Sequence, residues 1–410
     1  MNPLPNAPYQ AKDDRVVQNV LVLGATGSIG TATLDVLRKL NQVDSKCRWN
    51  LWGASGHSKL NQLLELCSDE SEVGSGSHLL FSDCQQGTQF RELNPAVEKR
   101  LFGIGPDALT EAAGHSEVDI VVAAIVGRAG LESTLAAIDA GKRVALANKE
   151  TLVVAGPVVQ QKLASSEAEL LPVDSEHSAV FQCLQGANAP PRKIILTASG
   201  GPFRTWTKDQ MTVATPESAL SHPTWEMGPK ISIDSATMMN KALEIIEAKW
   251  LFGLPAESIE VMVHPQSIIH SMVEFQDGSV LSQMSPPDMR LPIQYALTYP
   301  DRLPSDSPPF DRGRTWGLEL EVADLDRFPA LGLGFEVARV GGTAGAVLNA
   351  ANEEAVGLFL DGKIRFTDIV EGCGDVLRNH QFEPTPTLER LLQLDKWARN
   401  ELRKRMRVTD

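Results

Sequence analysis

Two carboxylates stand two residues apart in residues 173–177 (VDSEH), at the end of an apolar run typical of a β-strand. Alternate side chains of a strand share a face, so the pattern predicts that Asp174 and Glu176 point to one place. Carboxylates aimed at one point repel each other unless a cation or a shared proton is present. Oxygen ligands suit Mg²⁺ or Mn²⁺. A solvated loop gives the same spacing, so this segment alone does not decide for a metal site.

A second group of polar side chains lies in residues 233–244 (IDSATMMNKALE). Asn240 and Glu244 are four residues apart, and Lys241 and Glu244 are three apart, so a helix would place them on one face. A carboxylate, an amide and an ammonium on that face could complete the site of the first two carboxylates. An exposed face with one ion pair explains the pattern equally well, and Glu247 competes with Glu244 on spacing.

Two further segments are candidate ligand loops. Residues 197–203 (TASGGPF) follow a strand-like run, and the two glycines could form an anion-binding nest with the hydroxyl of Ser199. A structural turn is the alternative. Residues 220–230 (LSHPTWEMGPK) lack a helix or strand pattern, and their prolines, glycine and Trp225 predict a lid. A buried loop anchored by the tryptophan is the other interpretation.

A glycine-rich turn, residues 24–30 (GATGSIG), follows the strand-like residues 20–23 and precedes a helical pattern. Glycines let the backbone approach a pyrophosphate, and the helix directs its free N–H groups at that anion. Thr26 and Ser28 could add hydroxyl donors. A tight structural turn has the same pattern, but the position between strand and helix favours a dinucleotide site.

The second strand-like segment indicates which dinucleotide is bound. NAD sites carry an acidic residue about 20 residues after the glycine turn. Residues 53–59 (GASGHSK) contain no carboxylate. Hydroxyls, an imidazole and an ammonium suit a 2′-phosphate, so NADP is favoured, and His57, Ser58 and Lys59 remain alternatives for that contact.

The elements that position these residues fall into three groups. Strand and helix patterns alternate up to residue 150, ending in a strand at 143–150 (RVALANKE) that leads into a loop, which predicts a doubly wound parallel sheet of the Rossmann-like α/β class. Residues 165–300 mix strands and helices as in an α+β domain with a mixed or antiparallel sheet. In this region Asp234 or Ser235 is positioned to cap a helix. Helical spacing from residue 331 onward predicts a small C-terminal bundle.

Composition excludes several classes. The 410 residues, 42% hydrophobic and 22% charged, suit a globular chain of two or three domains. A net charge of −14 argues against partners such as nucleic acids or anionic membranes, which need a basic surface. No apolar run approaches the ~18 residues of a membrane span. Five widely spaced cysteines without a Cys-x-x-Cys pair, and an N-terminus without an apolar signal core, predict a cytoplasmic protein.

Seven segments together resemble the 1-deoxy-D-xylulose 5-phosphate reductoisomerase family, whose enzymes form 2-C-methyl-D-erythritol 4-phosphate in isoprenoid synthesis. The 28-residue block at 221–248 is the most specific of them. The segments are GATGSIG, ALANKE, PVDSEHSA, LTASGGPFR, SHPTWEMGPKISIDSATMMNKALEIIEA, HPQSIIHSMVEF and SPPDMR.

The resemblance implies an NADPH-dependent, homodimeric oxidoreductase and isomerase. Such an enzyme rearranges the carbon skeleton of the small phosphorylated sugar with the help of a divalent metal and then reduces the product with hydride from NADPH. The metal, Mg²⁺, Mn²⁺ or Co²⁺, would be held by Asp174, Glu176 and Glu244, which selects Glu244 over Glu247. Lys149 would join these three in the catalytic set.

The resemblance also implies binding residues. The family pattern places substrate contacts at Lys149, Ser175, Glu176, Ser199, His222, Trp225, Ser235, Asn240, Lys241 and Glu244, with Trp225 covering the site. It places NADPH contacts at Thr26, Gly27, Ser28, Ile29, Gly56, Ser58, Lys59, Asn148, Glu150 and Gly228. Residues 56–59 (GHSK) depart from the Lys-Asn pair common in the family, so the 2′-phosphate contacts stay unassigned.

The expected divisions follow from the patterns along the chain together with the resemblance. They are an N-terminal arm at 1–16, an NADPH-binding Rossmann-like domain at 17–163, a catalytic and dimerisation domain at 164–298 with a lid at about 219–230, a linker at 299–325 and a C-terminal helical domain at 326–410.

Three other functions compete with this hypothesis. Another NADP-dependent dehydrogenase would share the glycine turn but would not need a site of three carboxylates. A non-catalytic NADP-binding sensor could lose any of those carboxylates, and all three are present. A sugar-phosphate isomerase without redox chemistry would leave the glycine turn without a ligand.

Overall fold

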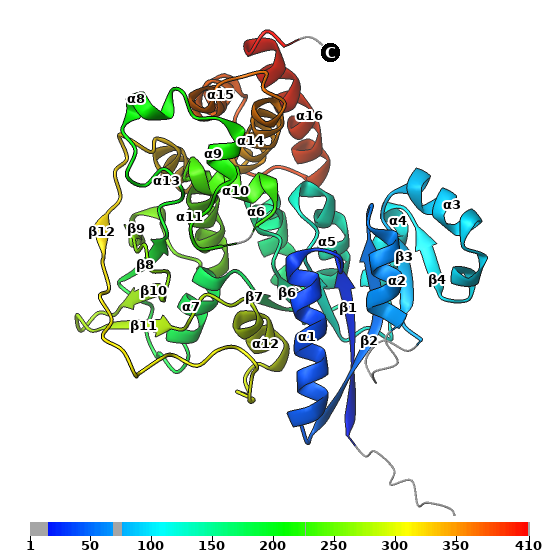
Figure 1. Ribbon diagram of the computed structural model, residues 1–410. Coiled ribbons are helices and arrows are strands. Elements are labelled where there is room, and N and C mark those ends of the chain that lie inside the picture. The colour runs from blue at the N-terminus through cyan, green and yellow to red at the C-terminus, as the bar shows by residue number, and fades with distance from the viewer. Residues whose placement is uncertain (1–14, 69–75, 226, 409–410) are drawn as a thin grey trace, which may run out of the picture.

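The computed structural model describes residues 15–68, 76–225 and 227–408, so nearly all of the predicted N-terminal arm lies outside the described residues. Its first half is built on seven parallel strands in the order β4-β3-β2-β1-β5-β6-β7 (Figure 1). The strands are β1 (Val16–Leu23), β2 (Cys47–Gly56), β3 (His78–Phe81), β4 (Leu101–Ile104), β5 (Ile120–Ala123), β6 (Arg143–Leu146) and β7 (Glu169–Pro172). The predicted doubly wound sheet is confirmed.

Helices cover both faces of this sheet. One face carries α1 (Ser28–Val43), α2 (Leu60–Ser68), α3 (Cys84–Leu93), the 3-10 turn η1 (Pro95–Lys99) and α12 (Arg290–Thr298). The other carries α4 (Pro106–Ala113), the 3-10 turn η2 (Gly127–Gly130), α5 (Leu131–Asp139) and α6 (Lys149–Leu163). The interior strand β5, next to the central β1, is buried at every residue, which explains its continuous apolar sequence.

The second half contains a five-stranded sheet in the order β11-β10-β8-β9-β12. Only β8 and β9 are parallel, so the predicted mixed sheet is confirmed. Its strands are β8 (Lys193–Ala198), β9 (Ile259–Val263), β10 (Ile269–Glu274), β11 (Val280–Met284) and β12 (Glu321–Val322). Its helices are α7 (Ser175–Cys183), α8 (Lys208–Met211), α9 (Pro216–Leu220), α10 (Pro229–Ala236), α11 (Met239–Phe252) and the 3-10 turn η3 (Ala256–Ser258).

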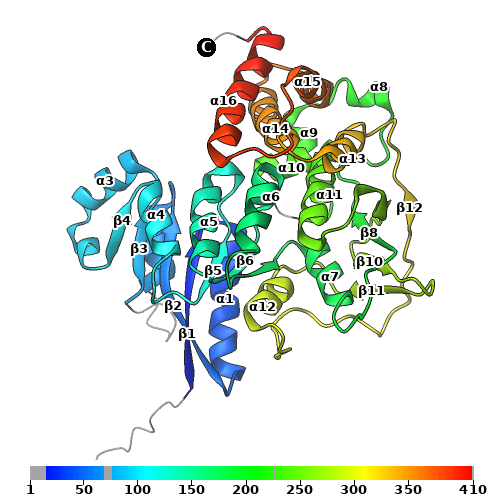
Figure 2. The same ribbon diagram turned by 180° about the vertical axis from the view of Figure 1, so that it is seen from behind.

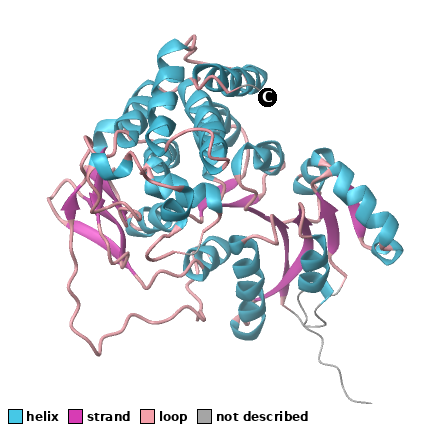
Figure 3. Ribbon diagram, turned by 45° about the horizontal axis from the view of Figure 1, so that its top comes forward, coloured by secondary structure: helices cyan, strands magenta, loops and turns pink. Residues whose placement is uncertain are grey.

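Two strands cross the divisions expected from the sequence. Strand β7 follows residue 163, yet it pairs with β6 and belongs to the first sheet. Strand β12 lies inside the predicted linker 299–325 and pairs with β9. The preceding part of that linker runs as an extended loop outside the sheets, visible at the lower left of Figure 3.

The C-terminal helices pack on the first half through α6, as seen from behind in Figure 2. A Cβ added at Gly345 would lie 2.0 Å from the carbonyl oxygen of Val153, and one added at Gly156 would lie 2.3 Å from Nε1 of Trp250. Helix α6 therefore approaches α14 backbone to backbone, and the side chain of Trp250 on α11 packs directly on the backbone of α6. The C-terminal helices are α13 (Ala330–Val340), α14 (Ala344–Leu360), α15 (Phe366–Asn379) and α16 (Leu388–Arg405).

Ala346 of α14 and Leu391 of α16 belong to the apolar core on the α5–α6 side of the first sheet. The two halves of the chain therefore share a core. Among the described residues, no helix combines the length and the apolar character that crossing a membrane requires.

Candidate active site

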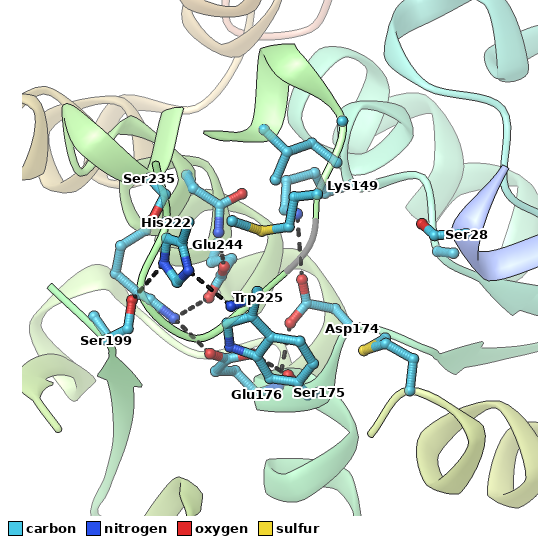
Figure 4. Close-up of a pocket in the computed structure, with 18 of the residues that line it drawn as sticks. Ser28, Lys149, Asp174, Ser175, Glu176, Ser199, His222, Trp225, Ser235 and Glu244 are labelled. Carbon is cyan, nitrogen blue, oxygen red and sulfur yellow. Dashed lines mark hydrogen bonds and ion pairs between the residues drawn. The ribbon is translucent and has the colours of Figure 1, made fainter. Parts of the chain in front are cut away.

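A pocket of about 200 Å³ lies where the carboxyl ends of the first sheet face α10 and α11 (Figure 4). The parallel strands bring their following loops to one edge, which is where such sheets bind ligands. Fourteen predicted site residues line it: Ser28, Ile29, Lys149, Asp174, Ser175, Glu176, Ser199, His222, Trp225, Gly228, Ser235, Asn240, Lys241 and Glu244.

Asp174 and Glu176 do converge, but the expected strand geometry is wrong. Strand β7 ends at Pro172, and Asp174 is the N-cap of α7, where its carboxylate accepts the N–H of Glu176 at 3.2 Å. Ser175 donates its hydroxyl to Oε2 of Glu176 at 2.5 Å. The first turn of a helix, rather than alternation along a strand, brings the two carboxylates together.

The polar face predicted on a helix is present on α11. Asn240 donates to Oε1 of Glu244, and the ammonium of Lys241 pairs with Oε2 of Glu244 and, at 3.2 Å, with Oε1 of Glu176. The side chains of Lys241 and Glu244 are only 4% and 1% exposed, which excludes the alternative of a solvated face.

The predicted cap of this helix is wrong. Asp234 and Ser235 lie within the last turn of α10, and α11 starts after Met238, whose backbone is left-handed (φ 61°). The expected loop after β6 is also wrong, because Asn148 caps α6 and Lys149 is the first residue of that helix.

Two ammonium groups offset part of the negative charge of the three carboxylates. Lys149 Nζ lies 3.3 Å from Oδ2 of Asp174 (Figure 4), and Lys241 pairs with Glu176 and Glu244. Burial opposes ionisation of Asp174, but the charges of Lys149, His177 and Lys241 outweigh it and hold its pKa below the usual range. Burial likewise lowers the pKa of Lys149, and the charges of Asp174 and Glu244 more than compensate, so the ammonium stays protonated.

Glu244 is the carboxylate with the most unfavourable surroundings. Burial and the negative charge of Asp174 raise its pKa to about 8, and Lys241 offsets only part of this effect. The ligand oxygens of Asp174, Glu176 and Glu244 lie within 4.8 Å of one another. Such a cluster favours a divalent cation, which would relieve the repulsion and displace the proton.

A second acidic group, Asp174 with His177 and Glu247, lies behind the first. His177 Nε2 is 3.0 Å from the carbonyl oxygen of Glu244, and Nδ1 is 3.1 Å from Oε2 of Glu247. Both ring nitrogens face acceptors. Burial lowers the pKa of His177, but Glu247 raises it to about 9, so the ring is cationic at neutral pH. Glu247 does not line the pocket, which separates it from Glu244.

The other end of the pocket carries neutral donors. His222 accepts the N–H groups of Thr224 and Trp225 at Nδ1 (3.2 and 2.9 Å), so Nε2 carries the hydrogen and faces Oγ of Ser199 at 3.0 Å. Partial burial lowers the pKa of His222, which keeps the ring neutral. These contacts fold the lid segment toward the loop after β8.

The glycine turn after β8 brings Ser199 beside α10. Gly201 has a φ of 66°, and a Cβ there would lie 2.4 Å from the carbonyl oxygen of Ser235. The N–H of Gly201 donates to Oγ of Ser199 at 3.2 Å. Only a glycine allows this approach, which places the hydroxyls of Ser199 and Ser235 in one pocket.

The glycine turn after β1 opens a neighbouring pocket. A Cβ at Gly24 would lie 2.6 Å from the carbonyl oxygen of Ala124, so this position needs glycine. Ser55 of β2 holds the turn by accepting the N–H groups of Gly24, at Oγ, and of Ala25, at its carbonyl oxygen. Gly27 is the N-cap of α1, no side chain caps the helix, and its first turn has no acidic residue, so the helix start is open toward this pocket.

Predicted residues from two other segments also line this neighbouring pocket, namely Asn148, Lys149 and Glu150 at the start of α6 and Asn240 on α11. Asn148 donates to the carbonyl oxygens of Ile125 and Gly127 and, at 3.0 Å, to Oε2 of Glu150. Burial raises the pKa of Glu150, but the charges of Lys230 and Lys149 outweigh it and leave the pKa lowered.

Four predicted cofactor residues line neither pocket. Thr26 lies in the glycine turn, and Gly56, Ser58 and Lys59 lie at and beyond the end of β2, where Ser58 and Lys59 are exposed. Sequence reasoning also missed lining residues. Ala147, Ile231 and Met289 are apolar and carried no chemical signal, whereas Lys230 ends the lid segment and could have been found from its charge.

Comparisons with known proteins cover nearly all of the chain. The profile described as 1-deoxy-D-xylulose 5-phosphate reductoisomerase matches residues 20–156. Two C-terminal domain profiles of the same enzyme match residues 170–252 and 284–401.

Relatives agree with these profiles. The 1-deoxy-D-xylulose 5-phosphate reductoisomerase of Rhodopirellula baltica is 56% identical over 95% of each chain, and that of Cupriavidus metallidurans is 48% identical over 93% of this chain and 97% of its own.

Solved structures agree as well. The Zymomonas mobilis enzyme in complex with NADPH superposes with a TM-score of 0.86 at 42% identity, covering 96% of this chain and 100% of its own. A DOX-P reductoisomerase in complex with NADPH, fosmidomycin and magnesium gives 0.87 at 40% identity, covering 95% and 98%. The chain therefore belongs to the 1-deoxy-D-xylulose 5-phosphate reductoisomerase family.

Proposed function

We propose that this protein converts 1-deoxy-D-xylulose 5-phosphate into 2-C-methyl-D-erythritol 4-phosphate with NADPH and a divalent metal, in isoprenoid precursor synthesis. One observation carries the proposal. The carboxylates of Asp174, Glu176 and Glu244 converge beside Lys149 in a pocket that adjoins a glycine turn at a helix start. A dehydrogenase without a metal would have no use for the first feature, and an isomerase without redox chemistry would have none for the second.

The residues present fit a hard cation. All three ligand side chains offer oxygen, each of them is ion-paired to a lysine, and Glu244 has a raised pKa that a bound cation would reverse. A bound Mg²⁺, Mn²⁺ or Co²⁺ would act as a Lewis acid on the carbonyl and hydroxyl oxygens of the sugar. A crystal of a related enzyme contains magnesium, which supports this assignment.

The second pocket fits the reducing cofactor. The open start of α1 suits a pyrophosphate, with Thr26, Gly27, Ser28 and Ile29 along the turn. NADPH would supply hydride when bound. We assign the other cofactor contacts to Asn148, Glu150 and Gly228 by the family pattern, and to Gly56, Ser58 and Lys59 by their position at and beyond the end of β2.

The neutral end of the main pocket suits the phosphate of the sugar. Neutral hydroxyl and imidazole N–H groups can donate to an anion without a desolvated counter-charge. Asn240 and Lys241, at the border between the two ends, would link the phosphate to the metal site. These contacts would come from Ser199, His222, Ser235, Asn240 and Lys241.

The charged end performs the chemistry in this proposal. Lys149 stays protonated beside Asp174, so it can offset negative charge that develops on the sugar oxygens. Ser175 orients the carboxylate of Glu176 and contacts the sugar. Trp225, on the segment held by His222, would cover the site and exclude water while the skeleton rearranges.

Absorbance at 340 nm tests the proposal directly. Purified protein is mixed with NADPH and 1-deoxy-D-xylulose 5-phosphate, with and without Mg²⁺ or Mn²⁺. We expect oxidation only when the sugar phosphate and the metal are both present. Oxidation without metal would contradict the carboxylate site, and folded protein that binds NADPH but never oxidises it would contradict the substrate.

We also propose that the protein is a homodimer. Strand β11 is an edge strand of the second sheet, and its Val280, Leu281 and Met284 are 50%, 50% and 38% exposed. An apolar edge with unpaired backbone groups is a surface that a second copy could cover. Light scattering should give a mass near twice the 44.5 kDa of one chain. A Leu281→Lys variant should shift that mass toward one chain, and an unchanged dimer would place the interface elsewhere.

A cytoplasmic location is the last part of the proposal. All five cysteines are free, including the exposed Cys84. Free thiols persist in reducing compartments. Fractionation of cells that express the tagged protein would test it, and recovery outside the cytoplasm would contradict it.

A further inference from the structure

A chain of buried polar contacts runs from the C-terminal helices to the cofactor pocket. It starts at Asn352 on α14, passes through Asp234 and Lys230 on α10, and ends at Glu150 on α6. These three helices are far apart in sequence and meet on one side of the pocket that the glycine turn opens.

The contacts in this chain are short and continuous. Asn352 donates from Nδ2 to Oδ1 of Asp234 at 2.8 Å, and the ammonium of Lys230 lies 2.8 Å from Oδ2 of the same carboxylate. The ammonium also donates to Oε1 of Glu150 at 2.9 Å. Glu150 in turn accepts from Nδ2 of Asn148 at 3.0 Å.

The first two members of the chain have no contact with either pocket. Asn352 is completely buried and Asp234 is 1% exposed, and neither lines a cavity. A buried carboxylate is unfavourable unless charges and donors satisfy it. The side-chain contacts of Asp234 are with Asn352 and Lys230, and only Lys230 lines a pocket, so we expect the carboxylate to act through Lys230.

Lys230 is the member that reaches the ligand. It lines the cofactor pocket together with Asn148 and Glu150, and its side chain is 17% exposed. An ammonium has three N–H groups, and the two carboxylates account for two of them, which leaves one for a ligand. A lysine has many rotamers, so without Asp234 its head group would not be fixed above Glu150.

We propose that Asp234 and Asn352 are positioning residues for the nicotinamide cofactor, acting through Lys230 and Glu150. They hold the ammonium in place on one wall of the cofactor pocket and connect α14 to that wall. The inference rests on the proposed binding of NADPH in this pocket. If it is correct, the C-terminal helix α14 contributes to the affinity for the cofactor through Asn352.

The test compares cofactor binding with substrate use in full-length variants. Asp234→Asn keeps the shape of the side chain and removes its charge. We expect the Kd for NADPH, measured from the fluorescence of the nucleotide without sugar phosphate, to rise about tenfold. The KM for the sugar phosphate should stay within about twofold, because the phosphate end is not in this chain of contacts.

Asn352→Ala is the second variant, in case the first does not fold. It keeps both carboxylates and the lysine and removes only the amide, so we expect a rise of about threefold to tenfold in the Kd for NADPH. Asp44→Asn is the matched control. Asp44 is also buried, and its carboxylate accepts the Nε1–H of Trp49 at 3.0 Å. It precedes β2, at the amino ends of the strands, whereas the pocket lies at their carboxyl ends. Its variant should lower Tm without changing the Kd.

Two results would overturn the inference. One is an unchanged Kd for NADPH in both folded variants. The other is a parallel rise in the Kd for NADPH and the KM for the sugar phosphate, which is what general loosening produces. The binding measurement needs no turnover. A wild-type protein that binds NADPH and does not convert the sugar phosphate would contradict the proposed function, and the Kd values would still decide this inference.

Discussion

The two ends of the main pocket differ in the kind of side chain that forms them. We call the charged end the metal end and the neutral end the phosphate end, after the ligands proposed for them. The metal end consists of buried and partly buried charges at or near the N-terminal ends of α6, α7 and α11, and each charge has a partner of opposite sign within 3.3 Å. The phosphate end consists of neutral groups, such as Ser199 and His222, that stand on turns and on the lid segment.

This difference indicates which end of the pocket is preorganised and which end can change its structure when a ligand binds. Buried ion pairs lose much when one member is removed, and they hold a single geometry. Neutral hydrogen bonds on loops contribute less each and can form when a ligand arrives. The metal end is therefore organised before binding, while the phosphate end can close over the substrate.

Replacing a ligand at the metal end should have the largest effect. We expect Glu244→Gln to lower kcat by about 10²-fold to 10³-fold, because several kcal/mol of charge stabilisation are lost with the metal. The Kd for NADPH should hardly change. Steady-state rates at saturating Mg²⁺ and fluorescence titration with NADPH would measure both effects.

Glu247→Gln is the matched control for that variant. It lies on the same helix, is equally buried and pairs with His177, but does not line the pocket. It should lower Tm more than it lowers kcat. If the two variants lost activity equally, Glu247 would have to be counted as a ligand.

The affinity for metal should depend on pH at the same end. Glu244 has a pKa of about 8 and so carries a proton at pH 6 to 7 that a cation must displace. We therefore expect the apparent affinity for Mn²⁺ to rise by up to about tenfold per pH unit from pH 6 and to level off above about pH 8. Calorimetry in buffers of different ionisation enthalpy would also show one proton released. A flat profile would mean that Glu244 is already ionised in the free protein.

A change at the phosphate end should have the smallest effect. Ser199→Ala removes one neutral hydroxyl, so we expect the KM for the sugar phosphate to rise about twofold to tenfold with little change in kcat. Ser218→Ala, in the exposed capping box of α9, is the control and should leave KM unchanged. A loss of kcat comparable to that of Glu244→Gln would remove the distinction between the two ends.

The sequence predicted best what local spacing determines. Lys241 and Glu244 fall on one face because they are three residues apart on α11. The strand proposed for Asp174 and Glu176 was wrong, because Pro172 ends β7 and the following aspartate starts a helix. That error was avoidable, since an aspartate with a glutamate in the first turn is also a helix-start pattern.

Contacts between segments that are distant in the sequence cannot be predicted from the spacing of residues. Nothing local places Ser199 and Ser235 in one pocket, because that depends on the turn at Gly201 packing against α10. The same holds for Asn352 and Asp234, which are 118 residues apart. The divisions at residues 163 and 299 stay predictions, and β7 and β12 each pair with a strand on the other side of one of them.

The backbone contact between Gly345 and Val153 has a consequence for the order in which the protein matures on the ribosome. Helix α6 carries Lys149 and Glu150 at its start, and its flank stays uncovered until α14 has been translated. Ala346 and Leu391 complete the same core from still later parts of the chain. A nascent chain stalled before residue 344 would thus expose the apolar surface of α6 that α14 covers. The pocket is therefore expected to reach its final structure only near the end of synthesis.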